Sequence, residues 1–136
     1  MGMDQNFYIM KKRNIPVFII KMRTFFKWTP TDSDFYLKIL DSVKMEEIGY
    51  ARKSYTLHDL IVKNVPGASK DNGGWTHMND EGLQKCFVEL VEREAYKDED
   101  LLKALQVLTE VCYKKLCYDM EKDDGEDYGI VYSANW

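Results

Sequence analysis

The alternation of hydrophobic and polar positions near the start of the chain predicts two β-strands. The first covers residues 7–10 and the second covers residues 17–28. Along one face of the second strand, every other position is apolar or threonine: Ile20, Met22, Thr24, Phe26 and Trp28. A period of two is typical of a strand with one buried face and one solvent-facing face. We therefore expect an N-terminal β-hairpin, with Pro16 at the start of its second strand.

Apolar residues at intervals of three and four predict helices over much of the remaining chain. One helix is expected over residues 33–48, ended by Gly49. Another is expected from near Asn79, and a last one begins at Asp98 or Asp100. The last helix has the clearest apolar stripe: Leu101, Leu105, Leu108, Cys112 and Leu116.

Two further segments each fit more than one structure. Residues 54–64 suit a short helix or a strand, and we favour the helix. Residues 119–136 carry six acidic side chains against one lysine. They form either an acidic, flexible tail or, over residues 130–132, a strand that joins the hairpin. The predicted fold class is α+β: an N-terminal β-hairpin followed by about four helices, with the C-terminal half helical, in a single domain over residues 1–136.

The composition is that of a globular domain rather than a disordered or fibrous chain. Of the 136 residues, 45% are hydrophobic and 13% are aromatic, which is enough to form a buried core. No apolar run approaches the ~20 residues that cross a bilayer, so no membrane partner is expected. Three cysteines cannot form a closed set of disulfides, and reduced cysteines are typical of the cell interior. We expect an intracellular protein, either cytoplasmic or nuclear.

The residues that could carry chemistry do not form a recognisable catalytic or metal-binding set. His58 stands beside Asp59, but adjacent residues of a helix or strand point in different directions. Cys86 lies on the apolar stripe of its helix, where a thiolate is disfavoured. Cys112 and Cys117 are five residues apart, which places them on different sides of a helix, so they cannot readily bind one zinc ion. We expect no enzyme activity, no cofactor and no metal.

The stretch without periodicity between residues 66 and 79 predicts a loop that displays Trp75. Its glycines and Asn72 are typical of tight turns, and tryptophan is enriched at interaction hot spots. We therefore predict a small non-enzymatic protein–protein interaction or regulatory domain that binds and modulates a partner protein. The expected contact residues belong to the loop and to the basic face of the hairpin: Trp75, Asn72, His77, Met78, Lys21, Arg23 and Lys27.

The basic second strand also suggests a nucleic-acid partner as an alternative. Its lysines and arginine are interleaved with aromatic residues, and rings can stack on bases while the cations contact phosphates. The sequence pI of about 5.2 counts against this, because nucleic-acid-binding domains are usually basic. The hypothesis is a single-stranded nucleic-acid binder that uses this strand.

A third hypothesis comes from a short motif. Residues 71–75 read Asp-Asn-Gly-Gly-Trp, and residues 87–90 read Phe-Val-Glu-Leu. Together they resemble the second homology motif of the Bcl-2 apoptosis regulators, with a longer spacing between the two pieces. The resemblance implies a helical bundle with a hydrophobic groove that takes an amphipathic helix, and a role in apoptosis or immune signalling.

Overall fold

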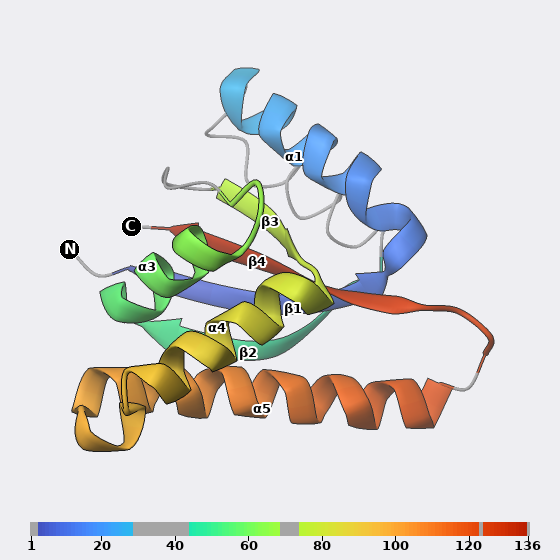
Figure 1. Ribbon diagram of the computed structural model, residues 1–136. Helices are drawn as coiled ribbons and strands as arrows, with labels where there is room; N and C mark the ends of the chain where they lie inside the picture. Colours follow the sequence, from blue (N-terminus) through green and yellow to red (C-terminus); the bar gives the residue numbers. More distant parts are fainter. Residues whose placement is uncertain (1–2, 29–43, 69–73, 123, 136) are drawn as a thin grey trace.

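The computed structural model describes residues 3–28, 44–68, 74–122 and 124–135, with the backbone alone for residues 23–28. Its strands form one antiparallel sheet with the spatial order β2-β1-β4-β3. They are β1 (Asp4–Lys11), β2 (Glu46–Arg52), β3 (Gly74–Met78) and β4 (Tyr128–Asn135). The described helices are α1 (Ile15–Trp28), α3 (Tyr55–Asn64), α4 (Asp80–Glu92) and α5 (Glu99–Lys122). The α+β fold class is confirmed (Figure 1).

The C-terminal segment forms a central strand of the sheet. β4 pairs with β1 along its whole length, from Asp4 opposite Asn135 to Lys11 opposite Tyr128, and with β3 on its other side. Every side chain of β4 except the last is buried. A strand that is covered on both faces is mostly apolar along its length rather than alternating, and Ser133 is the one buried polar side chain of β4. Of the two structures that fitted residues 130–132, the strand is the one observed.

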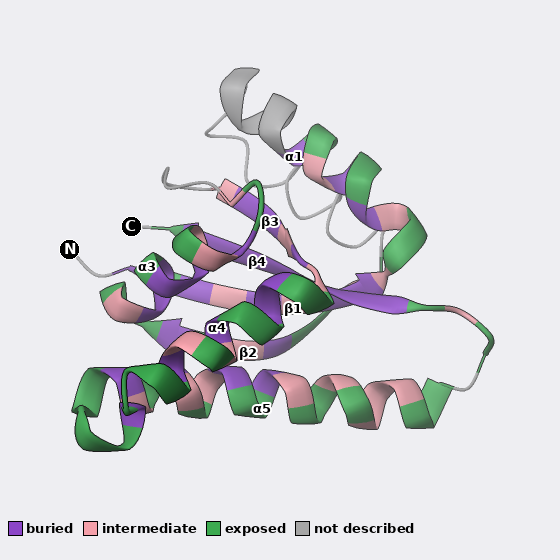
Figure 2. Cartoon of the chain, in the orientation of Figure 1, coloured by how far each residue is buried: buried purple, intermediate pink, exposed green. Residues whose placement is uncertain are grey.

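Helices cover both faces of the sheet and create two hydrophobic cores (Figures 1 and 2). The larger core lies between the sheet and α3, α4 and α5, and it contains Phe7, Ile9 and Tyr132 from the central strands. The smaller core lies between the sheet and α1, and it contains Met10, Trp75 and Val131. Neighbouring strand residues alternate between the two cores because side chains of a strand point to opposite faces.

The predicted N-terminal hairpin is wrong in its second strand. Residues 17–28 belong to the helix α1, and β1 pairs instead with β2 and β4. The segment that was predicted from its period of two also fits helical spacing. Within it and just before it, Ile15, Phe18 and Met22 are buried at intervals of three and four residues. Pro16 lies in the first turn of α1, where proline costs no hydrogen bond.

The helix predicted over residues 33–48 mostly falls outside the described residues, and its end is wrong. Residues 46–48 lie in β2, and Gly49, expected to end the helix, is an interior residue of that strand. Gly49 allows close packing, because a Cβ there would lie 2.5 Å from Cγ2 of Val111 on α5. β2 and α5 therefore approach closely at a position where a larger residue would collide.

The other helix predictions are confirmed. Residues 55–64 form α3, as favoured over a strand. Asn79 caps α4, since its Oδ1 accepts a hydrogen bond of 2.7 Å from the backbone N–H of Gly82. Asp98 precedes α5 and accepts bonds of 2.9 and 3.1 Å from the backbone N–H groups of Asp100 and Leu101. The sequence pattern predicted that the two helices start near Asn79 and at Asp98 or Asp100, and the structure confirms both starts.

The fold does not match the helical bundle that the Bcl-2 resemblance implied. The two pieces of that motif lie in different kinds of element, since Trp75 is in β3 and residues 87–90 are in α4. A four-stranded sheet stands at the centre of the molecule. The sequence similarity therefore does not extend to the architecture.

Candidate functional site: the outer face of α5

Trp75, the predicted interface anchor, is a core residue. Only 1% of its surface is exposed, and it lies in β3 rather than at the tip of a loop. Its ring stacks on Tyr8 at 5.6 Å between centroids and meets the edge of Phe18 at 5.1 Å. The tryptophan thus joins the sheet to α1, and the prediction that it displays itself to a partner is wrong.

The remaining predicted contact residues do not gather around Trp75 on one surface. Met78 is buried in the larger core, on the opposite side of the sheet from Trp75. His77 is half-buried, and burial together with the charge of Lys12 lowers the pKa of its imidazole, against an opposing effect of Asp80. Lys21 is exposed on α1. Asn72 and the side chains of Arg23 and Lys27 lie outside the described part of the molecule.

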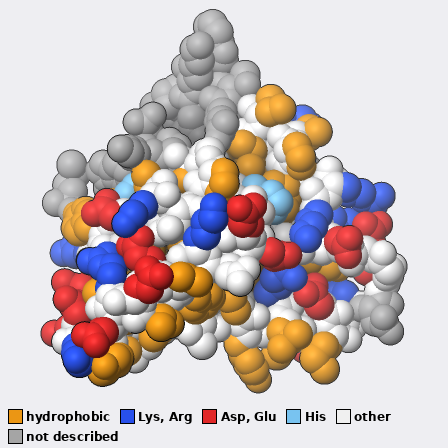
Figure 3. Space-filling model, viewed as in Figure 1, with side chains coloured by type: hydrophobic (Ala, Val, Ile, Leu, Met, Phe, Trp, Pro, Cys, Tyr) orange, Lys and Arg blue, Asp and Glu red, His pale blue; other side chains and the backbone are white. Residues whose placement is uncertain are grey.

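The most distinctive exposed feature of the described residues is the outer face of α5. Tyr113, Leu116 and Met120 are exposed by 67%, 59% and 73%. Their spacing of three and four residues places them on one line along the helix. Hydrophobic side chains accordingly gather along the lower edge of the molecule in Figure 3, where α5 runs.

The exposed line continues toward the N-terminus of α5. At alternating intervals of four and three residues it comprises Leu102, Gln106, Thr109, Tyr113, Leu116 and Met120, with Cys117 beside it. Leu102 and Cys117 are half-buried, and the others are exposed. A hydrogen bond with Cys117 raises the pKa of the Tyr113 hydroxyl, which places this thiol on the same outer face. We call this set the outer face of α5.

The opposite face of α5 holds the helix to the rest of the molecule. Leu101, Ala104, Leu108 and Val111 are buried there, in the larger core. Leu116 was predicted on the same apolar stripe as Leu101 and Leu108, but it is 59% exposed and does not share their buried face. Apolar residues surround α5 more widely than one buried face requires. This excess width was the signal in the sequence that apolar residues occupy a second face of the helix as well.

Charged side chains border the outer face on one side. Lys103, Glu110, Lys114 and Glu121 recur at intervals of seven, four and seven residues, so they line one flank of the stripe. Within the chain, Lys114 pairs with Glu110 at 3.0 Å and Lys103 pairs with Glu99 at 3.7 Å. Exposed apolar residues with a charged border are typical of a protein contact surface.

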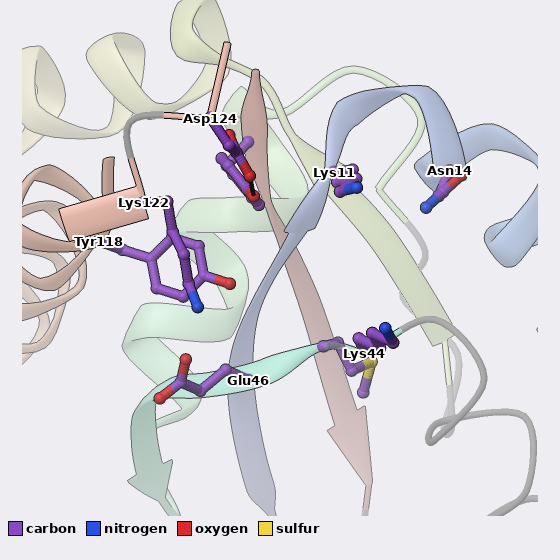
Figure 4. Close-up of a pocket in the computed structure, with 9 residues that line it drawn as sticks. Lys11, Asn14, Lys44, Glu46, Tyr118, Lys122 and Asp124 are labelled. Atoms are coloured by element: carbon purple, nitrogen blue, oxygen red, sulfur yellow. Dashed lines mark hydrogen bonds between the residues drawn. The ribbon is translucent and has the colours of Figure 1, made fainter. Parts of the chain in front are cut away.

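A surface pocket of about 570 Å³ lies near the C-terminal end of α5 and is a second candidate site. In Figure 4, Tyr118 and Lys122 from α5 line one side of it, and Lys11 and Asn14 line the other. Lys44 and Glu46, at the start of β2, close it below in that view. Three lysines are opposed by the carboxylates of Glu46 and Asp124, which leaves one net positive charge. With one net positive charge, the pocket can accept a small anion, but it is not a strongly positive anion-binding site.

The two tyrosines of this pocket are held by local contacts. The ring of Tyr128 meets the edge of Tyr118 at 4.9 Å, and the Lys122 ammonium lies 5.1 Å from the Tyr118 centroid. The Tyr128 hydroxyl donates a hydrogen bond of 2.6 Å to Asp124, which raises the pKa of Tyr128 to about 12 and lowers that of Asp124. These contacts fasten the end of α5 to β4 and leave no activated acid or base among them.

His58 belongs to a buried structural network. The Tyr132 hydroxyl donates to Gln5 Oε1 at 2.7 Å, so Nδ1 of His58 is the donor in its 2.8 Å bond to the same hydroxyl. Gln5 in turn donates to the carbonyl oxygen of Ser54 at 2.8 Å. Burial raises the pKa of Tyr132 far above its usual range. The network joins α3 to the two central strands, and its members have no access to a substrate.

The described residues contain no group of three or more His, Cys, Asp or Glu side chains that could hold a metal ion. Cys86, Cys112 and Cys117 are free thiols. Burial and the charge of Glu89 raise the pKa of Cys86 to about 12. Within the same residues, no helix has the length and apolar character needed to cross a membrane.

Comparison of the chain with protein-family models, with curated proteins and with solved structures found no match.

Proposed function

We propose that this chain is a small non-enzymatic protein-interaction domain that binds and modulates another protein chain through the outer face of α5. The observation that carries the proposal is the exposure of Tyr113, Leu116 and Met120 on one line of a helix that is already fixed by its opposite face. Burial of each such side chain in a complex would contribute about 1.5–3 kcal/mol. None of them is needed to hold α5 on the sheet.

The placement of reactive groups supports a binding rather than a catalytic role. The Cys86 thiol lies inside the larger core, where it donates a weak hydrogen bond of 3.8 Å to the carbonyl oxygen of Leu60. Tyr132 and His58 are buried in the network beneath α3. In enzymes, groups with strongly shifted pKa values usually face a cleft, whereas the strongly shifted Cys86 and Tyr132 are buried in the core.

The nucleic-acid hypothesis loses its structural basis. It required a strand with cations on one face and rings on the other, and the segment is the helix α1. Phe18 and Met22 of this helix are buried against the sheet. The proposed function therefore does not use this segment.

A comparison of two matched variants tests the proposal. Leu116→Glu places a charge on the outer face of α5, and Val91→Glu places one on an exposed apolar position of α4, where 73% of the residue is accessible. Each tagged protein is used to capture proteins from a nuclease-treated extract that also contains an untagged copy of the chain. Capture should persist for the wild type and Val91→Glu and fall at least tenfold for Leu116→Glu. Equal capture by all three would contradict the proposal.

A further inference from the structure

We infer that the chain bound by the outer face of α5 is a second copy of this protein, with the two α5 helices packed antiparallel about a twofold axis. This inference rests on the proposed function and names its partner. It follows from the order of charges along the helix, because a twofold interface brings each residue opposite a defined position of the other copy.

In an antiparallel helix pair, residues that lie equally far on either side of the twofold axis face each other. Lys103 and Glu121 lie nine residues on either side of residue 112, and Glu110 and Lys114 lie two residues on either side of it. Both pairs have opposite charge and share one centre. All four side chains line the same flank of the outer face, and in an antiparallel pair equal flanks meet. The arrangement would form four ion pairs between the copies, because each pair occurs twice.

The residues of the outer face are also symmetric about a point on the helix, and this point lies within one position of residue 112, the centre of the charged pairs. Leu102 and Met120 are symmetric about residue 111, so each would pack on the other across the interface. Tyr113 lies close to the axis, where the two copies of its ring approach each other. Gln106 and Cys117 are symmetric about a point between residues 111 and 112. One antiparallel register thus satisfies the apolar stripe and its charged flank together.

A parallel pair does not satisfy the same flank. In a parallel pair opposite flanks meet, so Lys103, Glu110, Lys114 and Glu121 would face the flank of Leu105, Cys112 and Asp119, where their charges would lack a matching row. The other flank, with Leu105, Cys112 and Asp119, is compatible with the antiparallel pair, because Asp119 is neutralised within its chain by Lys115 at 2.8 Å. The charge pattern therefore selects the antiparallel orientation.

The register can be tested with one new cysteine. Within one chain, residues 106 and 117 are separated by eleven positions, or about 16 Å along a helix, which no disulfide can span. In the antiparallel pair, a cysteine at position 106 would lie opposite Cys117 of the other copy. We expect Gln106→Cys to form a covalent dimer under mild oxidation with glutathione disulfide, and Gln106→Ser to form none.

Peptide mapping by mass spectrometry of the oxidised protein identifies the linked residues. A bond between positions 106 and 117 of different chains, found in most of the Gln106→Cys protein, supports the inference. A Cys117–Cys117 bond in the wild type would contradict this register and overturn the inference, as would a dimer linked only through other positions.

Charge exchange supplies a second test that needs no cysteine. Glu110→Lys alone should weaken dimerisation about tenfold, and combination with Lys114→Glu should restore it, because opposite charges face each other again. A wild-type protein that stays monomeric at all concentrations overturns the inference. If Leu116→Glu still abolishes the capture of a different protein in that case, the proposed function stands and only the identity of the partner is wrong.

Discussion

At the scale of single residues, exposure decides the role of an aromatic or apolar side chain more than its type does. Trp75 follows two glycines, as expected of an interface anchor at a loop tip, yet it packs between Tyr8 and Phe18. Tyr113 and Leu116 look like core residues of an amphipathic helix, yet they face solvent. The sequence pattern predicted Trp75 at the surface and Leu116 on the main apolar stripe of its helix, and the structure shows the reverse exposure for both.

The core position of Trp75 leads to a direct prediction. Trp75→Ala should lower the free energy of unfolding by about 3–5 kcal/mol, because it removes a large buried ring and leaves a cavity between β3 and α1. Tyr96→Ala is the matched control, since this residue is 69% exposed and lies outside the proposed interface, so removal of its ring should change stability by less than about 0.5 kcal/mol. Urea denaturation of the three proteins measures the difference. Equal stabilities would mean that Trp75 is not in the core.

At the scale of elements, local patterns identified the caps and the later helices and failed for α1. Asn79 and Asp98 act within one turn of their own helices, so the sequence contains everything that their role requires. The apolar residues of segment 17–28 fit the two-residue period of a strand and the 3.6-residue period of a helix equally well. Local spacing therefore does not decide between the two structures. The choice depends on packing against Trp75 and Val131, which are far away in the sequence.

The outer face of α5 was missed for a related reason. The sequence shows that apolar residues occupy more than one side of this helix, but not which side meets the sheet. That is decided by β2, where Gly49 lets Val111 approach the strand closely. The helix is thereby oriented with Leu101 and Leu108 inward and Leu116 outward. Tertiary contacts between distant segments fix the candidate site, and no local pattern contains them.

The contact between α3 and α4 predicts a dependence of stability on pH. Burial alone would raise the pKa of Glu89, but hydrogen bonds from Lys63, Asn64 and Arg93 lower it overall below its ordinary 4.5. Lys63 Nζ lies 2.8 Å from one carboxylate oxygen and an Arg93 nitrogen lies 3.2 Å from the other. Because the folded state holds the charged form, Glu89 stabilises the protein above pH 4.5, and this stabilisation is lost as the pH falls through the lowered pKa.

Glu89→Gln tests this sign. At pH 7 the variant should be less stable than the wild type by about 1 kcal/mol, a modest value because both cations are largely exposed. The difference should shrink as the pH falls below 4.5 and through the lowered pKa of Glu89. Glu92→Gln, which removes the same charge from an exposed position of α4, is the control. Thermal unfolding between pH 3 and pH 8 measures the effect, and a difference that grows in acid would contradict the account.

At the scale of the whole molecule, the fold leaves one helix with a buried apolar face and an exposed, partly apolar face. The sheet is covered on one side by α1 and on the other by α3, α4 and α5, and its central strand β4 is buried. The α+β class could be predicted from the mixture of patterns, while the order β2-β1-β4-β3 could not, because it pairs the first and last segments of the chain. Once the core is complete, the outer face of α5 remains as an apolar surface with an ordered row of charges.

Sedimentation velocity of the purified protein over a range of concentrations tests this account most directly. The chain has a mass of 16.0 kDa, and the wild type and Val91→Glu should move toward twice that mass as the concentration rises. Leu116→Glu should stay at 16.0 kDa while its unfolding temperature is unchanged. A wild type that remains a monomer throughout, or a Leu116→Glu variant that dimerises equally well, would show that the outer face of α5 does not bind a second copy.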